Sequence, residues 1–175
     1  KSNPSNKKLD NLVGKFLKKD IGIGLYKETR KVYKSNHYIS SLNLLERRDV
    51  HLGIDIFTDE GTVIRSPLDG KVVILQNNND EFDYGPTVVL EHNINPKVKF
   101  YTLYGHLSKK CMKSLSIGKK IKEGVEFAEI GNYPTNGNWS PHLHFQIIID
   151  LMCEKKSFPG VAEENLLSMW TKISP

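Results

Sequence analysis

The sequence predicts an all-β protein whose core is an antiparallel β-sandwich or barrel. Beyond Val50, short runs of alternating apolar residues recur at close spacing. Turn-forming clusters of Gly, Pro, Asn and Asp separate these runs, as at Asn77–Asp80 and Asn136–Asn138. Many short strands with such turns between them are typical of sandwiches and barrels. We therefore expect one antiparallel core, with a short helix before it and a helical tail behind it.

Length and composition are those of a single globular domain. The chain has 175 residues, of which 38% are hydrophobic and 26% are charged, and domains usually contain about 100–200 residues. The longest apolar runs, such as Thr87–Leu90 and Ile147–Ile149, are far shorter than the roughly 18 residues that a membrane span needs. We therefore expect no membrane-spanning segment.

The formal net charge of +5 does not indicate a nucleic-acid partner. Only four of the 25 basic residues are arginine, and the lysines form scattered doublets interleaved with acidic residues. Arginine is the residue that reads phosphates and guanines through paired hydrogen bonds. We expect a solvated lysine-rich surface and no nucleic-acid partner.

The cysteines and the N-terminus bear on the compartment. Cys111 and Cys153 stand alone, without a CxxC pair, so we expect two free thiols rather than a bridge. No apolar stretch follows the polar N-terminus, so no signal peptide is visible, and the chain begins without Met. The compartment stays open: cytoplasmic or, for a processed fragment, periplasmic or extracellular. The chain also fits a part of a longer multidomain protein.

Residues 1–46 are expected to form an N-terminal extension that packs on the core. Apolar residues at i, i+3, i+4, i+7 and i+8 predict a helix over Leu9–Leu17, which Asp20 and the glycines after it end. The pattern between Tyr26 and Asp49 is ambiguous. A strand near Lys31–Tyr33 and a turn or short helix over Ser40–Leu45 both fit it.

The core is expected over residues 47–150 and the helical tail over residues 151–175. Period-two alternation predicts core strands at Ile54–Phe57, Thr62–Ile64, Gly70–Leu75, Thr87–Glu91, Val98–Tyr104, Glu126–Ile130 and Leu143–Ile149. In the tail, the sequence predicts a helix around Ala162–Trp170.

The last core strand carries two histidines side by side. Alternation puts His142, His144 and Gln146 on one face of it. The apolar residues Leu143, Phe145, Ile147 and Ile149 point to the other face and are expected to pack into the core. A lone buried histidine is more often structural, but two imidazoles at i and i+2 indicate a metal or catalytic site.

Two further elements supply chemistry of the same kind, although each is weak alone. On an extended chain His51 and Asp55 share one face, and Gly53 places no side chain between them. An imidazole and a carboxylate converging in this slot suit Zn²⁺, which takes nitrogen and oxygen ligands at about 2.0–2.2 Å. The other element ends at His106, on a strand face that also carries Tyr104.

Together the three elements resemble the lysostaphin or LytM-type zinc metallopeptidase family. The pattern of that family is an HxxxD, then a YxHL, then an HLHF. This chain reads, in the same order, His51–Asp55, Tyr104–Leu107 and His142–Phe145. The resemblance spans about residues 47–149 and includes the family's turn and hairpin between the motifs, at Ser66–Val72 and Ser116–Gly124.

The resemblance implies a role for each motif residue. His51, Asp55 and His144 would hold one Zn²⁺ per chain, and His106 and His142 would be the catalytic pair. The implied fold is a compact antiparallel β-sandwich of the duplicated-hybrid-motif kind, with the site in a groove on one sheet. The implied activity is that of a zinc metalloendopeptidase, a hydrolase whose family substrates are peptides of bacterial peptidoglycan.

One loop departs from the family pattern. The family usually has small residues before HLHF, whereas this chain has the bulky Tyr133 and Trp139 there. We expect Tyr104, Tyr133 and Trp139 to contact the substrate. Tyr133 and Trp139 are expected to narrow the groove and to favour a substrate with an apolar or aromatic flank. The alternative for Trp139 is that it folds back on the sandwich as a hydrophobic contact.

Other functions fit the same residues. A non-catalytic zinc-binding or scaffold module of this fold is expected to lack one or more of the five motif residues, and this chain keeps them all. A phosphocarrier domain would be expected to avoid Asp55 as a full ligand. A domain of a larger protein that acts on small peptides is also open. Because the chain has no HExxH motif, His106 or His142 has to act as the base, and which of them does so stays open.

Overall fold

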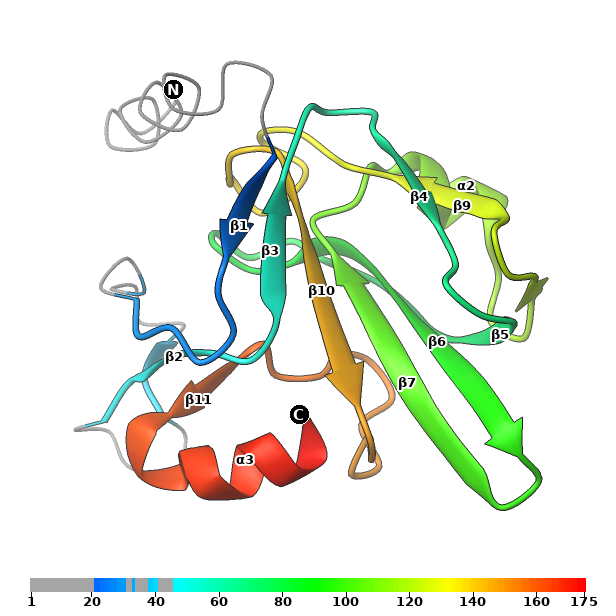
Figure 1. Ribbon diagram of the computed structural model, residues 1–175. Coiled ribbons are helices and arrows are strands. Elements are labelled where there is room, and N and C mark those ends of the chain that lie inside the picture. Colours follow the sequence, from blue (N-terminus) through cyan, green and yellow to red (C-terminus); the bar gives the residue numbers. More distant parts are fainter. Residues whose placement is uncertain (1–20, 31–32, 34–37, 41–45) are drawn as a thin grey trace.

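The computed structural model describes residues 21–30, 33, 38–40 and 46–175, and a seven-stranded antiparallel sheet dominates it (Figure 1). In sheet order the strands are β1 (Gly22–Gly24), β3 (Ile54–Phe57), β10 (His142–Ile148), β7 (Val98–Gly105), β6 (Gly85–Asn95), β5 (Gly70–Asn78) and β8 (Lys120–Ile121). The smaller elements are β2 (Arg48–His51) paired with β11 (Val161–Glu163), β4 (Val63–Arg65) paired with β9 (Glu126–Glu129), and the helices α2 (Lys110–Ser114) and α3 (Leu167–Ile173). The predicted all-β antiparallel fold is confirmed.

The predicted strands all have a counterpart, and the main differences lie at their ends. β3 has its predicted bounds, whereas β5 continues to Asn78, through residues whose composition predicted a turn. The ladder with β6 continues there, pairing Asn77 with Pro86 and Asn78 with Gly85. Pairing with a long neighbouring strand therefore overrides the turn preference of asparagine.

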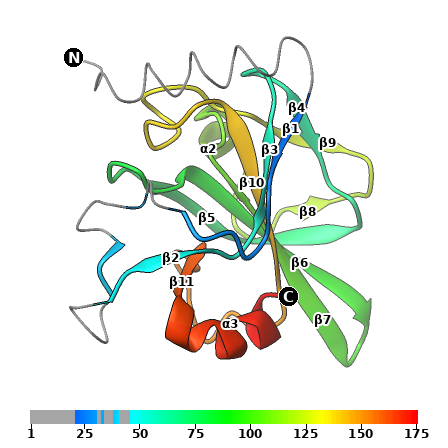
Figure 2. The same ribbon diagram turned by 60° about the vertical axis from the view of Figure 1, so that its left-hand side comes forward.

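The main sheet buries apolar side chains on both of its faces. On one face it packs against β4, β9 and α2, in a first core of Ile64, Val72, Val88, Leu90, Tyr104, Leu107, Cys111, Leu115, Ile121, Phe127, Ala128, Ile130 and Leu143. On the opposite face lies a second core of Ile74, Tyr84, Val89, Tyr101, Leu103, Ile148 and Phe158, against which Trp170 and Ile173 of α3 also pack. Figure 2 shows α3 lying apart from β4, β9 and α2.

Burial along β10 corrects part of the predicted core. Leu143 and Phe145 pack with the first core as expected, but Ile147 and Ile149 are 39% and 48% exposed. Ile148, on the histidine face of the strand, is fully buried in the second core. The histidine face of β10 is buried along the whole strand, whereas the opposite face becomes exposed at Ile147, so the predicted core face is wrong at the far end of the strand.

The tail is helical later than predicted. Val161–Glu163 pairs with β2, a short 3₁₀ turn follows at Glu164–Leu166, and α3 then begins at Leu167. Trp170 packs edge-on against Phe158, with ring centroids 6.1 Å apart. This contact joins the tail to the second core.

In the N-terminal region, β1 joins the edge of the main sheet by pairing with β3. The predicted helix over Leu9–Leu17, the candidate strand near Lys31–Tyr33 and the candidate turn over Ser40–Leu45 lie wholly or mostly outside the described residues. Cys111 is buried and Cys153 is exposed, and both are free thiols. Across the described residues, no helix is long and apolar enough to cross a membrane.

Candidate metal centre and catalytic pocket

Three predicted ligands meet at one point between β2, β3 and β10. The ligand atoms of His51, Asp55 and His144 all lie within 4.8 Å of one another. Nε2 of His51 is 2.9 Å from Nδ1 of His144, and Oδ1 of Asp55 is 3.2 and 3.1 Å from these two nitrogens. Asp55 and His144 are directly opposite each other in the β3–β10 ladder. All three side chains are buried.

Gly53 makes this convergence possible, although not along one extended strand as predicted. His51 ends β2 and Asp55 lies in β3, with a bend at Gly53 between them. A Cβ atom at Gly53 would lie 2.7 Å from Cε1 of His144 and 2.6 Å from the carbonyl oxygen of Phe145. Any larger residue would therefore displace His144 from the cluster.

In each ligand imidazole, the ring nitrogen that does not face the cluster contacts an oxygen atom, and this contact orients the ring. Nδ1 of His51 lies 3.0 Å from the carbonyl oxygen of Leu25, and Nε2 of His144 lies 3.0 Å from Oε1 of Gln146. The amide nitrogen of Gln146 donates in turn to Ser174 Oγ at 2.9 Å and to the carbonyl of Pro159 at 3.1 Å. Oxygen partners at these positions leave Nε2 of His51 and Nδ1 of His144 free to bind a metal ion.

The electrostatics of the cluster favour the protonation states of metal ligands. Burial opposes ionisation of Asp55, but His142, His144 and His51 together hold the pKa of its carboxyl well below the ordinary range. Burial lowers the pKa of His51, against the opposite effect of Asp55. An ionised carboxylate and a neutral imidazole are the forms that bind a divalent metal.

The donor set fits zinc. Two imidazole nitrogens and one carboxylate oxygen form a three-residue set of the kind found in catalytic zinc sites, which keep a fourth position for water or substrate. Ligand atoms bound at about 2.0–2.2 Å to a tetrahedral ion stand roughly 3.4 Å apart. The three separations found here are 2.9, 3.1 and 3.2 Å, so only small shifts would be needed.

The two remaining histidines of the motifs lie beside this cluster. The rings of His106 and His142 are 4.3 Å apart, and Nε2 of His142 is 3.8 Å from Oδ1 of Asp55. Nδ1 of His106 contacts the carbonyl oxygen of Asn136 at 2.8 Å, and Nδ1 of His142 contacts that of Ser140 at 2.7 Å. Because a carbonyl only accepts, each Nδ1 carries the hydrogen and each Nε2 is left as the basic nitrogen. Burial lowers the pKa of both imidazoles, which favours their neutral form.

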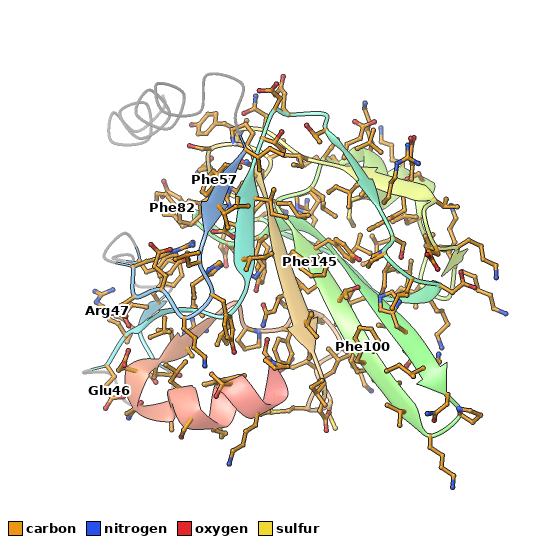
Figure 3. The ribbon with its side chains drawn as sticks, viewed as in Figure 1. Glu46, Arg47, Phe57, Phe82, Phe100 and Phe145 are labelled. Atoms are coloured by element: carbon orange, nitrogen blue, oxygen red, sulfur yellow. The ribbon has the colours of Figure 1, made fainter. Side chains whose placement is uncertain are left out.

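The cluster opens into a pocket of about 800 Å³ with a strongly aromatic lining. Phe57 stacks on His142 with centroids 4.7 Å apart, and Phe82 meets the ring of Trp139 edge-on at 5.1 Å. Figure 3 labels Phe57 and Phe82 near β1 and β3, on the side of the molecule where this pocket lies. Tyr33 and Tyr38 continue the aromatic wall, with ring centroids 4.5 Å apart.

Trp139 lies on the pocket wall, next to the two catalytic candidates. Its ring meets His106 at 6.0 Å and His142 at 6.3 Å, and its indole N–H donates to the carbonyl of Asp83 at 3.2 Å. Gly137 and Asn138 before it have φ angles of 85° and 67°, as a tight turn requires. Phe82, whose ring contacts Trp139, has φ 66°, a left-handed conformation that a bulky residue rarely adopts.

Tyr104 as a substrate contact and Tyr133 as a part of the pocket wall need correction. Tyr104 is 1% exposed and packs against Phe127 and Phe145 in the first core, on the opposite face of the sheet from the site. The prediction assumed that the strand continues to His106, but β7 ends at Gly105 and His106 has φ 61°, which turns its ring to the other side. Tyr133 is exposed and does not line the pocket, so it does not narrow the pocket as expected.

Several residues of the site were not predicted. Arg30 contacts Asp55, and Tyr33, Phe57 and Phe82 line the pocket. They carry no motif. Arg30 and Tyr33 come from the segment whose secondary structure was ambiguous, and Phe82 lies between the Asn77–Asp80 turn and the strand predicted at Thr87–Glu91. Gln146 was recognisable from alternation, which placed it on the face of His142 and His144.

Sequence comparison connects the chain with a family of peptidases. The model of Peptidase family M23 matches residues 49–156, more than half of the chain. An uncharacterized metalloprotease of Haemophilus influenzae is 33% identical over 102 residues, which are 57% of this chain and 19% of that protein. Peptidoglycan DD-endopeptidase ShyB of Vibrio cholerae is 33% identical over 99 residues, 57% of this chain and 20% of that protein. The match thus spans about a fifth of the length of these relatives.

Structural comparison shows the same fold in solved structures. The catalytic domain of lysostaphin from Staphylococcus simulans superposes with a TM-score of 0.54 at 23% identity, covering 90% of this chain and 97% of that one. LytU superposes with a TM-score of 0.50 at 22% identity, covering 86% of this chain and 85% of that one. At these identities the similarity is one of fold.

Proposed function

The chain belongs to peptidase family M23, and from this premise we propose that it is a zinc metalloendopeptidase that hydrolyses peptide bonds in the peptides of peptidoglycan. One observation carries the proposal. His51, Asp55 and His144 converge with their metal-binding atoms free, and the paired imidazoles of His106 and His142 stand beside them. A purely structural zinc site would be closed by a fourth protein ligand and would not need that neighbouring pair.

A zinc ion held by His51, Asp55 and His144 would supply a bound water with a pKa near 7 and would polarise the substrate carbonyl. The chain's own residues would manage the proton. His142 and His106 each present Nε2 as the basic nitrogen, with Nδ1–H fixed on a backbone carbonyl. The burial that keeps both rings neutral suits either of them to accept a proton at Nε2, and the imidazolium formed in this way would carry the N–H and the positive charge that stabilise developing negative charge.

The aromatic lining of the pocket supports a preference for substrates with an apolar or aromatic group beside the cut bond. Phe57, Phe82 and Trp139 offer ring faces and edges close to the histidine pair. Such rings bind apolar groups and exclude water from the reaction. Peptidoglycan as the substrate class rests on ShyB, which is named a peptidoglycan endopeptidase.

The proposal is tested by the metal content of the purified chain and its variants. We expect one zinc per chain in the wild type and almost none after His51→Ala, Asp55→Ala or His144→Ala, because two remaining ligands hold zinc far more weakly. Asp59→Ala, which removes an exposed carboxylate outside the cluster, is the matched control and should keep its zinc. Elemental analysis measures all four variants.

Two outcomes would contradict the proposal. Full zinc occupancy in His144→Ala would refute the ligand set. A zinc-loaded wild type that cleaves neither peptidoglycan fragments nor a library of short peptides would instead indicate a zinc-binding module without catalysis.

A further inference from the structure

Arg30 reaches the metal cluster from outside the part of the chain that the family model matches. That match begins at residue 49, whereas Arg30 lies in the segment after β1. Its guanidinium forms an ion pair with Oδ2 of Asp55 through Nη1, and its side chain is only 15% exposed. A partly buried guanidinium therefore contacts the proposed carboxylate ligand directly.

The two oxygens of Asp55 face different partners. Oδ1 points to His51, His144 and His142, at 3.2, 3.1 and 3.8 Å. Oδ2 points away from this group and accepts from Arg30. The carboxylate thus has one oxygen directed at the metal position and the other engaged by an arginine.

Arg30 is itself held in a fixed place. Nη1 donates to the hydroxyl of Tyr33 at 3.1 Å, while Nε and Nη2 both lie 3.1 Å from Oε2 of Glu28. Gly24, opposite Asp55 in the β1–β3 ladder, leaves the room for it, since a Cβ there would lie 2.5 Å from Nη2. Glu28 also offsets the positive charge of the guanidinium, which lessens its repulsion of a divalent cation.

We propose that Arg30 is a positioning residue of the zinc centre, which holds Oδ2 of Asp55 and so restricts this carboxylate to binding zinc through Oδ1 alone. This inference rests on the proposed zinc site. A carboxylate with a free second oxygen can rotate and bind through both oxygens, which would occupy the position that water or substrate needs. Arginine suits the role because its planar group can bond Glu28, Tyr33 and Asp55 at once, whereas lysine has a single ammonium.

The test measures zinc affinity and coordination in the full chain, neither of which depends on turnover. Arg30→Met keeps the length and volume of the side chain but removes every donor. We expect its zinc dissociation constant, from competition with a chromophoric chelator, to rise about 10–100-fold. Arg30→Lys should restore only part of the lost zinc affinity if the planar geometry of the guanidinium matters, and all of it if the positive charge alone matters.

Cobalt(II) substitution reports the coordination directly. Four-coordinate cobalt absorbs visible light more strongly than five-coordinate cobalt, so the intensity of the visible spectrum reports the number of ligands on the ion. We expect the wild type to give the intense four-coordinate spectrum and Arg30→Met a weaker one, as Asp55 turns its second oxygen to the metal. Arg65→Met is the matched control, because Arg65 of β4 also pairs with a carboxylate, that of Glu126, but both of these side chains are exposed.

The outcomes separate this inference from the proposed function. A wild type that binds no zinc refutes the zinc site. A wild type that binds zinc tightly, together with Arg30→Met of unchanged affinity and unchanged cobalt spectrum, overturns the role of Arg30. Should Arg30→Met fail to fold, Tyr33→Phe decides: it removes one anchor of the guanidinium and keeps the ring, so a smaller loss of zinc affinity supports the role and no loss overturns it.

Discussion

At the scale of single residues, the five motif side chains form two groups with different surroundings. His51, Asp55 and His144 share one point in space with their metal-binding atoms turned inward. His106 and His142 have their Nδ1 atoms on backbone carbonyls and their Nε2 atoms available. The first arrangement suits metal binding and the second suits proton transfer, so the two groups should respond differently to mutation.

His106→Ala and His142→Ala should therefore keep zinc and lose activity. We expect a fall in kcat of about 10²–10⁴-fold in each, the usual contribution of a positioned acid or base. Elemental analysis and steady-state kinetics on the same preparations measure both properties. Loss of zinc in either variant would mean that the ligand set is wrong, and full activity in both would mean that neither ring moves the proton.

The sequence predicted these five residues because each lies in a short motif with fixed spacing. Alternation along the strand also placed Gln146 on the face of His142 and His144, where it bonds His144. Tyr104 was misplaced because a left-handed residue after the end of β7 reverses the direction of His106, and no spacing rule encodes that turn. Arg30 lies 25 residues from Asp55, and only the pairing of β1 with β3 brings them together.

At the scale of elements, the loop between β9 and β10 decides how much of the pocket is closed. Trp139 lies on its wall, and the side-chain amide of Asn136 donates to the carbonyl of Trp139 at 2.8 Å. The strands around it were predictable because they alternate over four or more residues. Within the loop, only the turn at Asn136–Asn138 was predictable. The direction of the Trp139 side chain was not, because it depends on contacts with Phe82 and Asp83, which are distant in the sequence.

Trp139→Gly should change which substrates bind rather than whether zinc binds. We expect KM to rise, or the preferred peptide to change, because the variant removes a ring from the pocket beside His106 and His142. Zinc content should stay at the wild-type level, since Trp139 contacts no proposed ligand. Kinetics on a set of peptides with apolar, aromatic and small flanking residues measures the effect.

Thermal unfolding of the same variant provides the control. Removing a tryptophan packed fully in a core costs about 3–5 kcal/mol, whereas Trp139 is only partly buried. A large drop in Tm with unchanged substrate preference would show that Trp139 serves the fold and not the pocket.

At the scale of the whole molecule, segments that precede and follow the motif-bearing strands in the sequence support the site. Ser174 near the C-terminal end orients Gln146, and its carbonyl accepts from the hydroxyl of Tyr26 at 2.6 Å. Arg30 and Ser174 both lie outside the matched residues 49–156. A family pattern therefore predicts the reactive centre, while some of the residues that orient it come from segments that the pattern does not describe.

The stability of the sheet should depend on pH through Glu91. This carboxylate accepts from Lys71 at 3.0 Å and pairs with Lys99 at 3.3 Å across three neighbouring strands. The hydrogen bond from Lys71 is the main cause that lowers the pKa of Glu91 below its ordinary value of 4.5. A carboxyl whose pKa is lowered on folding stabilises the protein above its unfolded-state pKa and loses this effect as pH falls through the folded-state value.

Glu91→Gln should accordingly reduce the free energy of unfolding by about 0.2–1 kcal/mol at neutral pH. The difference from the wild type should shrink as the pH falls below 4.5. Urea unfolding of the zinc-free proteins at a series of pH values measures it. Glu126→Gln, which breaks an exposed pair with Arg65, is the control with a smaller expected effect. A difference that stayed constant over the whole range would show that the pair does not act through charge.

Because Phe82 has a left-handed backbone conformation, laboratory evolution of this protein should meet a conflict between thermal stability and substrate specificity. A bulky residue in this conformation costs about 1–3 kcal/mol, a cost that Gly or Asn would largely avoid. The ring is only partly buried, so its loss is cheaper than that of a core aromatic. A screen that rewards heat resistance alone should enrich Gly or Asn at this position and remove the ring that faces Trp139. Selection for higher thermal stability would then also broaden the range of peptides that the protein accepts.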